Sequence, residues 1–98
     1  MKTLQFRRYE LEKSLAEDFV SWAVNEIFPL REKFGFKVEW SYFDRSNSEF
    51  VWMASAECTQ VEFEAKEAAW LASEERARAA VAMPQALKKL NASFVEKV

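Results

Sequence analysis

The sequence predicts an α+β domain in which helices cover one face of a four-stranded antiparallel sheet. Segments with strand-like and helical periodicity follow one another in the order strand, helix, strand, strand, helix, strand. The chain has 98 residues, which is enough for one core. The stretch Phe50–Ala54 is apolar at every position, so both faces of that strand are expected to leave water. The helices of so short a chain cover one face, and the other face is left for a partner.

The first strand is expected over Thr3–Leu11, where apolar and polar residues mix at period two. The first helix begins with a capping box formed by Ser14 and Glu17. Pro29 removes a backbone donor inside the helix and predicts a kink, and Gly35 suits a left-handed helix stop. The apolar face of this helix is formed by Leu15, Phe19, Trp22, Ala23, Ile27 and Leu30.

A hairpin is expected next. Its first strand alternates Phe36, Val38, Trp40 and Tyr42 with polar residues, and the turn formers at 44–48 lead into a second strand over 49–56. The next helix begins with a capping box of Thr59 and Glu62, and Ser73 starts a second helical piece that ends near Pro84. Its apolar side is expected to carry Val61, Ala65, Ala68, Ala69 and Ala72. A last strand contains Leu90, Ala92, Phe94, Val95 and Val98.

Right-handed crossovers over one sheet turn this order into a ferredoxin-like βαββαβ sandwich with the first and third strands in the centre. The third strand is the one without a polar face, which agrees with a central position. We therefore expect residues 1–98 to form one domain that pairs as a homodimer through its uncovered sheet face.

The composition limits which classes of partner and cofactor can be expected. The net charge of −2 and the scattered basic residues favour no nucleic-acid partner. The chain contains no run of about 18 apolar residues, the length that a membrane-spanning helix needs. The single cysteine cannot form an internal disulfide, which favours a reducing cytoplasmic location. Because the chain has no histidine, we expect neither a metal site nor a cofactor.

Several short segments together resemble the NIPSNAP family, a branch of the dimeric α+β barrels. They are Arg7-x-Tyr9, Pro29–Arg31, Lys33–Phe36, Phe50–Trp52 and Glu67–Trp70. The chain departs from the family in having Phe34 where a histidine is frequent, and in lacking a glycine near the end of the second strand. The resemblance implies a dimer with two sheets face to face and a cavity between each sheet and its own helices.

Relatives with this architecture include cofactor-free monooxygenases, haem-degrading enzymes and proteins of unknown role, so the fold does not settle the function. Haem degradation with a histidine ligand is excluded because histidine is absent. Three functions are compatible with the sequence. They are binding of a small hydrophobic or aromatic molecule, cofactor-independent oxygenation of an aromatic substrate, and a structural dimer with a filled core. A cavity below about 300 Å³ would make a drug-sized ligand doubtful.

Three residues are candidates for chemistry. Glu26 interrupts the apolar face of the first helix, where desolvation would let it act as a general acid or base. Alternatively, the kink at Pro29 turns it toward the rim, or an arginine pairs with it. Arg7 and Tyr9 share a strand face and could orient an anionic or phenolic ligand, or bond across the dimer.

Four more residues are candidates for ligand binding. Trp22, Trp40 and Trp52 could wall an aromatic cavity, although core packing explains them equally well. Arg8, on the strand face of Phe6, raises the same question as Arg7. Cys58 has no histidine to activate it and is not expected to act as a nucleophile.

Overall fold

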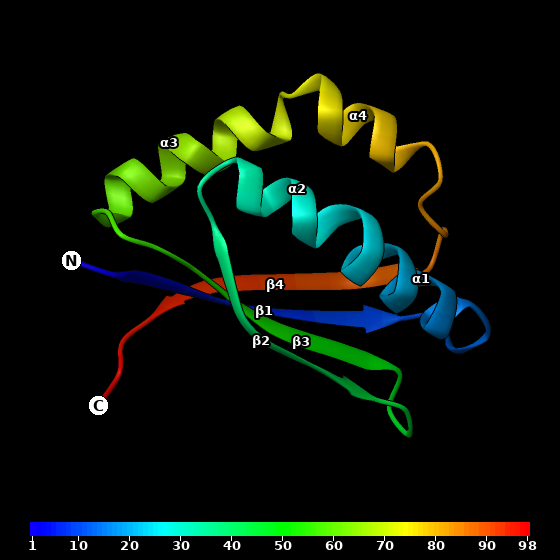
Figure 1. The fold of residues 1–98 in the computed structure, drawn as a ribbon. Coiled ribbons are helices and arrows are strands. Elements are labelled where there is room, and N and C mark those ends of the chain that lie inside the picture. The colour runs from blue at the N-terminus through cyan, green and yellow to red at the C-terminus, as the bar shows by residue number, and fades with distance from the viewer.

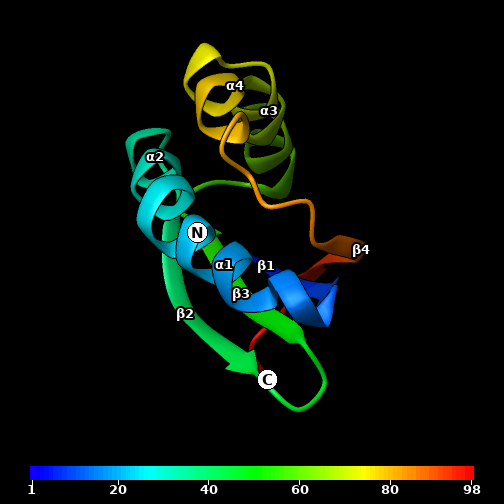
Figure 2. The same ribbon diagram turned by 90° about the vertical axis from the view of Figure 1, so that its right-hand side faces the viewer.

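The computed structural model describes residues 1–98, which form a sheet with all of the helices on one of its faces (Figures 1 and 2). The four strands are ordered β2-β3-β1-β4, and each neighbouring pair is antiparallel. The predicted α+β ferredoxin-like fold and the central position of the first and third strands are therefore confirmed. The strands are β1 (Thr3–Leu11), β2 (Lys37–Asp44), β3 (Glu49–Ala56) and β4 (Leu87–Val95).

The first helical unit consists of a 3-10 turn, η1 (Lys13–Leu15), followed by α1 (Ala16–Trp22), the π-helical segment η2 (Ala23–Ile27) and α2 (Phe28–Lys33). The predicted cap at Ser14 is wrong, because no side chain caps the start of either η1 or α1. The 3-10 turn provides the reason. The backbone N–H of Ala16, which a Ser14 cap could have satisfied, already donates to the Lys13 carbonyl within the turn.

The predicted kink at Pro29 takes the form of the π-helical segment η2 just before it. The N–H of Phe28 donates to the carbonyl of Ala23, five residues earlier. This wider turn removes the need for the backbone donor that proline lacks. The helix then ends at Gly35, whose φ of +92° confirms the predicted left-handed stop.

The second helical unit contains α3 (Gln60–Leu71) and α4 (Glu74–Ala80). Both caps are confirmed. Thr59 and Glu62 form a complete capping box, and the Ser73 hydroxyl accepts a hydrogen bond from the N–H of Arg76. The predicted apolar side of α3 is wrong, because its members are exposed. Phe63 and Trp70 are buried instead, since two large rings seven residues apart remove more apolar area from water than alanines do.

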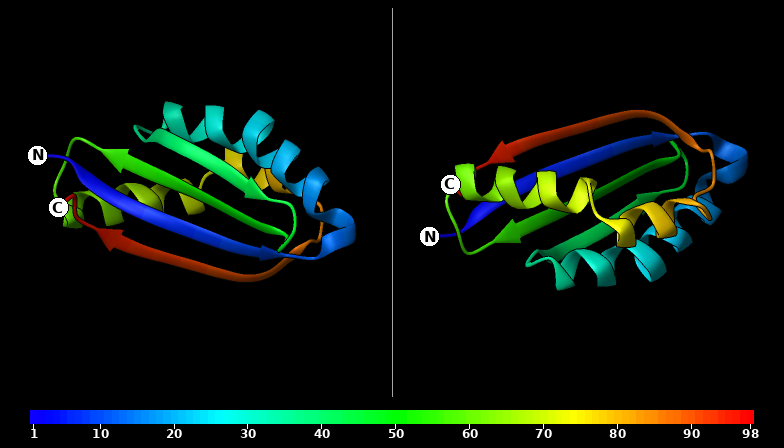
Figure 3. Two further views of the ribbon diagram at one scale, coloured as in Figure 1. Left: turned by 90° about the horizontal axis from the view of Figure 1, so that it is seen from below. Right: turned by 90° about the horizontal axis from the view of Figure 1, so that it is seen from above.

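The sheet face away from the helices is open, as the left view of Figure 3 shows. Leu4 of β1 and Val95 of β4 lie at one end of this face. Its centre carries five apolar side chains, those of Phe6 of β1, Val51 and Met53 of β3, and Trp40 and Tyr42 of β2. The stretch Phe50–Ala54 therefore does supply apolar residues to both faces, as predicted. We call this set of five residues the open-face strip. No helix is long and apolar enough to cross a membrane.

Candidate functional site

A cavity of about 90 Å³ lies between the sheet and the two helical units. Its inner end is formed by buried residues, among them Arg7 and Arg31 with exposed fractions of 7% and 3%. Its outer end opens to solvent between α4 and β4, where Leu87 and Leu90 are 41% and 42% exposed. The remaining lining residues are Tyr9, Phe19, Trp22, Ala23, Ile27, Phe28, Trp52, Trp70, Leu71, Arg76 and Met83.

The volume limits what the cavity can hold. Sites for drug-sized ligands enclose roughly 300–1,000 Å³, several times more than this one. As it stands, the cavity has room for a few water molecules or for a small molecule of about one ring. A larger ligand would need side chains at the open end to move.

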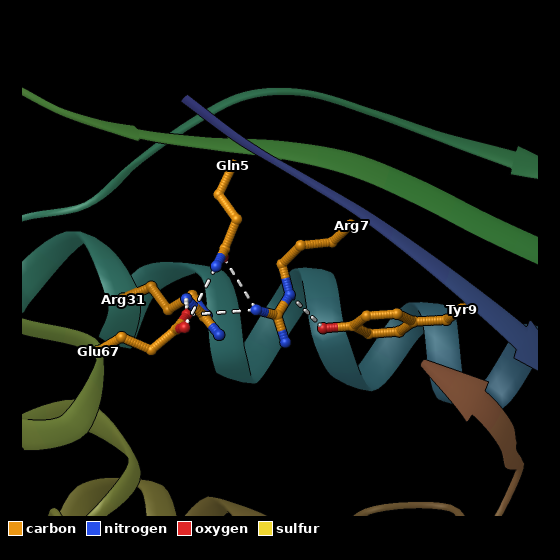
Figure 4. Close-up of polar contacts among 5 residues, drawn as sticks. All are labelled: Gln5, Arg7, Tyr9, Arg31 and Glu67. Atoms are coloured by element: carbon orange, nitrogen blue, oxygen red, sulfur yellow. Dashed lines mark hydrogen bonds and ion pairs between the residues drawn. The ribbon is translucent and has the colours of Figure 1, made fainter. Parts of the chain in front are cut away.

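A row of polar side chains crosses the inner end of the cavity (Figure 4). Gln5, Arg7 and Tyr9 project from β1 toward the helices because alternate residues of a strand share a face. The Nε of Arg7 donates to the hydroxyl of Tyr9 at 2.9 Å, and its Nη1 donates to Gln5 Oε1 at 3.0 Å and to Glu67 Oε2 at 3.2 Å. Gln5 Nε2 in turn donates to Glu67 Oε1 at 3.2 Å. We call these residues, together with Arg31, the polar row.

Arg31 reaches the polar row from α2 and is poorly paired. Its Nη1 lies 3.6 Å from Glu67 Oε2, which is within ion-pair range but too far for a hydrogen bond. Both Nη1 and Nε are buried without an acceptor, and so is the indole Nε1 of Trp52. Desolvation, followed by the nearby positive charge of Arg7, lowers the pKa of Arg31 to about 10.

Aromatic rings surround the two guanidinium groups. The central carbon of Arg31 lies 4.9 Å from the ring centroid of Trp52 and 5.6 Å from that of Trp70. Arg7 lies 5.3 Å from the same Trp52 ring. These cation–π contacts recover part of the hydration that the arginines lose on burial. Near the open end, the indole Nε1 of Trp22 donates to the carbonyl of Ala79 at 2.9 Å and ties α1 to α4.

The structure brings four of the predicted site residues together at this cavity: Arg7, Tyr9, Trp22 and Trp52. Trp40 and Arg8 lie on the open face instead. For Trp40 the prediction of a cavity position is wrong because of a β-bulge between Val38 and Trp40, which reverses the alternation of β2. Val38 consequently packs against the core from the helix side of the sheet, while Trp40 lies 6.0 Å from the Phe6 ring on the open face.

Glu26 lies in the π-helical segment and is exposed. Its expected position in the apolar face assumed regular α-helical spacing, which the wider turn of η2 does not keep. The desolvated carboxylate that was expected at this position is therefore not found. The alternative in which the helix turns Glu26 toward the rim describes its position.

Sequence reasoning missed Arg31, Glu67 and Gln5 as members of the site. Arg31 and Glu67 were singled out only as parts of short family-like segments. A signal was nevertheless available for Glu67, because it lies between Phe63 and Trp70 on the face that these rings define. No group of His, Cys, Asp and Glu side chains is placed to hold a metal ion.

The fold and the cavity define a ferredoxin-like α+β domain with a small site between its sheet and its helices. No protein-family model matches the sequence, and no curated protein matches it significantly. Solved structures do match the whole chain. An uncharacterized NIPSNAP domain protein from Burkholderia xenovorans superposes with a TM-score of 0.83 at 12% identity, covering 100% of this chain and 95% of the other.

Two further structures extend the comparison. A NIPSNAP family protein of unknown function from Agrobacterium tumefaciens has a TM-score of 0.83 at 9% identity, covering 96% of this chain and 86% of the other. A candidate antibiotic biosynthesis monooxygenase from Bacteroides thetaiotaomicron has a TM-score of 0.71 at 8% identity, covering 99% and 90%. At such identities the likeness shows the fold alone. This chain has the fold of the NIPSNAP family proteins, so the resemblance in its sequence is confirmed at the level of structure.

Proposed function

We propose that this protein is a homodimeric binding module that holds a small hydrophobic or aromatic molecule in the cavity between its sheet and its helices. The observation that carries the proposal is the combination of aromatic walls, an opening to solvent and a polar row at the buried end. Binding sites commonly pair an apolar lining with a few polar groups that fix the orientation of the ligand. The similar NIPSNAP structures of unknown function add no reaction to this proposal.

The open-face strip supports the dimer. Its members span three consecutive strands of the sheet. The rings of Phe6 on β1 and Trp40 on β2 approach to 6.0 Å between centroids, and those of Trp40 and Tyr42, both on β2, to 5.5 Å. Tyr42 is 66% exposed in the single chain. Charged pairs flank the strip, with Lys2 bound to Glu39 at 2.9 Å at one end. An apolar centre with a charged rim is the usual anatomy of a protein interface.

Substitution of Phe6 by glutamate tests the dimer by placing a charge in the middle of the strip. We expect sedimentation to show a dimer for the wild type and a monomer for Phe6→Glu. Val61→Glu is the matched control, because Val61 is apolar and 77% exposed but lies on α3, on the other side of the molecule. A wild-type protein that sediments as a folded monomer at micromolar concentration would remove the dimer from the proposal.

The binding function is tested first without any assumption about the ligand. Native mass spectrometry of freshly purified protein would reveal a retained molecule as a mass above that of the chain. Leu90→Trp, which places a large ring at the open end of the cavity, is expected to abolish retention. Leu71→Ala, which only enlarges the opening, is the control. Equal retention by the wild type and Leu90→Trp would place the ligand elsewhere and contradict the proposal.

Cofactor-independent oxygenation of an aromatic substrate is the second candidate. The likeness of fold to the Bacteroides protein favours it. The lining of the cavity weighs against it, because no aspartate or glutamate is among the lining residues to deprotonate a substrate. Oxygen uptake with an electron-rich phenol, lost in Tyr9→Phe, would favour the oxygenase over the simple binder.

We include a reducing, cytoplasmic setting in the proposal. The support for it is the single thiol of Cys58, which is buried and not bonded to another cysteine.

A further inference from the structure

We propose that the ligand of the cavity is a small organic monoanion, a carboxylate on an apolar body of about one ring, and that Arg31 binds the carboxylate. The inference rests on the proposed binding function and names the chemical class of its ligand. Three independent features of the site support it: the balance of charge, the balance of hydrogen-bond donors and acceptors, and the shape of the apolar walls.

The buried charges do not balance. The polar row contains the guanidinium groups of Arg7 and Arg31 but only one carboxylate, that of Glu67. The lining of the cavity adds a third arginine, Arg76, and no acidic residue. Two buried guanidinium groups share one carboxylate, and a buried charge that is incompletely paired is unfavourable, so one further negative charge would balance the site.

Glu67 does not supply that missing charge to Arg31. Both of its carboxylate oxygens already accept hydrogen bonds, Oε1 from Gln5 and Oε2 from Arg7. These two donors hold the carboxylate 3.6 Å from Arg31, beyond hydrogen-bond distance. Glu67 therefore shares its charge between two arginines, and a hydrogen-bond acceptor for Arg31 is left to water or to a ligand.

The hydrogen-bonding groups left free in the site are all donors. They are Nε and Nη1 of Arg31 and Nε1 of Trp52, each buried without an acceptor. No buried side-chain acceptor in the chain lacks a donor. Any group that satisfies these donors, water included, has to present acceptors. Among organic ligands, a carboxylate matches the planar fork of a guanidinium with two parallel hydrogen bonds.

The aromatic lining of the cavity and its volume determine what the uncharged part of the ligand can be. Phe19, Trp22 and Trp70 present aromatic surface to the cavity, and its volume of about 90 Å³ leaves room for a single ring or a short chain. A free inorganic anion would bind the arginine but leave the aromatic surface uncovered. We therefore expect the apolar body to contribute to affinity.

The test compares benzoate with benzamide, which has nearly the same shape but no charge. In isothermal titration calorimetry on the full-length wild-type protein, we expect benzoate to bind at least tenfold more tightly than benzamide. In Arg31→Met the two affinities should become equal. Arg8→Gln, which removes an arginine from the open face of the same strand that carries Arg7, should leave the preference unchanged.

Each outcome decides between the proposals. Equal binding of benzoate and benzamide by the wild type would overturn the inference and leave the binding function intact. Binding of inorganic phosphate as tight as that of benzoate would overturn the requirement for an apolar body. Absence of binding by either ring compound would contradict both proposals for ligands of this size.

A second measurement needs no variant and covers the case in which Arg31→Met fails to fold. Nuclear magnetic resonance detects the Nε–H group of each arginine, and a new hydrogen bond shifts its signal. Benzoate is expected to shift the Nε–H signal of Arg31 and to leave that of Arg8 in place. A titration that saturates without moving the Arg31 signal would place the carboxylate elsewhere and overturn the assignment.

Discussion

Replacing Arg31 by methionine is expected to stabilise the ligand-free protein, although it removes a buried side chain that touches aromatic rings. Burial and the proximity of Arg7 lower the pKa of Arg31 by more than two units, to about 10. At about 1.36 kcal/mol per pKa unit, keeping this guanidinium charged in the fold costs about 3 kcal/mol. Methionine fills a similar space without a charge and avoids that cost.

The expected gain in the free energy of unfolding is reduced because methionine cannot make some of the contacts of Arg31. The cation–π contact with Trp52 is worth about 0.5–2 kcal/mol, and the ion pair with Glu67 at 3.6 Å is weak. We therefore expect Arg31→Met to raise the free energy of unfolding by about 1–2 kcal/mol at neutral pH. The assay is urea unfolding at one fixed protein concentration, because dimerisation would otherwise change the apparent stability.

The pH dependence separates this explanation from a gain in packing. The pKa of Arg31 is lower in the folded than in the unfolded state, so the unfolded state binds more protons from about pH 10 up to the ordinary pKa of an arginine. The cost of the charge is therefore fully present below pH 10 and is relieved as the pH rises through that window. The advantage of Arg31→Met should be constant from pH 6 to 9 and should shrink above pH 10.

Arg7→Met is the matched control. Arg7 is buried on the same cavity but donates to three side chains, those of Gln5, Tyr9 and Glu67. Its loss leaves these partners without their donor, so we expect Arg7→Met to destabilise the fold by about 3 kcal/mol. If Arg31→Met proved as destabilising as Arg7→Met, the two arginines would form one structural unit, and the argument for an unpaired charge would be refuted.

Three further predictions concern the elements that position the cavity. Thr59→Ala should lower the free energy of unfolding by about 1 kcal/mol through loss of the α3 cap, and an unchanged thermal midpoint would contradict this role. Gly35→Ala should cost about 1–3 kcal/mol in urea unfolding because φ is +92°; the new methyl group itself would meet only the mobile end of Lys66. Trp22→Phe should cost about 1 kcal/mol and speed hydrogen exchange in α4, because the hydrogen bond to Ala79 is lost; unchanged exchange would show that this bond does not hold α4.

The sheet could be predicted from the sequence because its strongest signals are local. The mixed alternation of residues 3–11 and the continuous apolar stretch at 50–54 give the correct bounds and faces of β1 and β3. The bulge in β2 could not be predicted, because one extra residue leaves the local composition unchanged and reverses every side chain after it. That single irregularity moved Trp40 from the expected cavity to the open face.

The helices show the same limit. The capping boxes are short sequence signatures, and the one at Thr59 is found as predicted. Which face of a helix packs inward depends, in contrast, on which side chains bury the most area. The predicted inward face of α3 followed the spacing of its alanines and therefore missed the two large rings of Phe63 and Trp70. In the first helix the π-helical segment broke the 3.6-residue period on which the position of Glu26 depended.

The site was only half predicted, and the missing half is the part contributed by the helices. Arg7 and Tyr9 could be placed because both lie on one strand, where alternation fixes their common face. Arg31 and Glu67 come from α2 and α3, which are far apart in the chain, and their meeting depends on how the two helical units pack beside each other on the sheet. No local pattern reports such a contact.

The poorly paired Arg31 is also the strongest argument against a structural dimer with a filled core. A protein under selection only for stability would be expected to lose a buried charge that costs about 3 kcal/mol, since a single substitution to methionine removes it. Departures from this kind of local consistency concentrate at functional sites. Arg31 lines a cavity with an opening, and Arg7, which is paired with Glu67, lines the same cavity, so the cost would be explained if the proposed anion binds there.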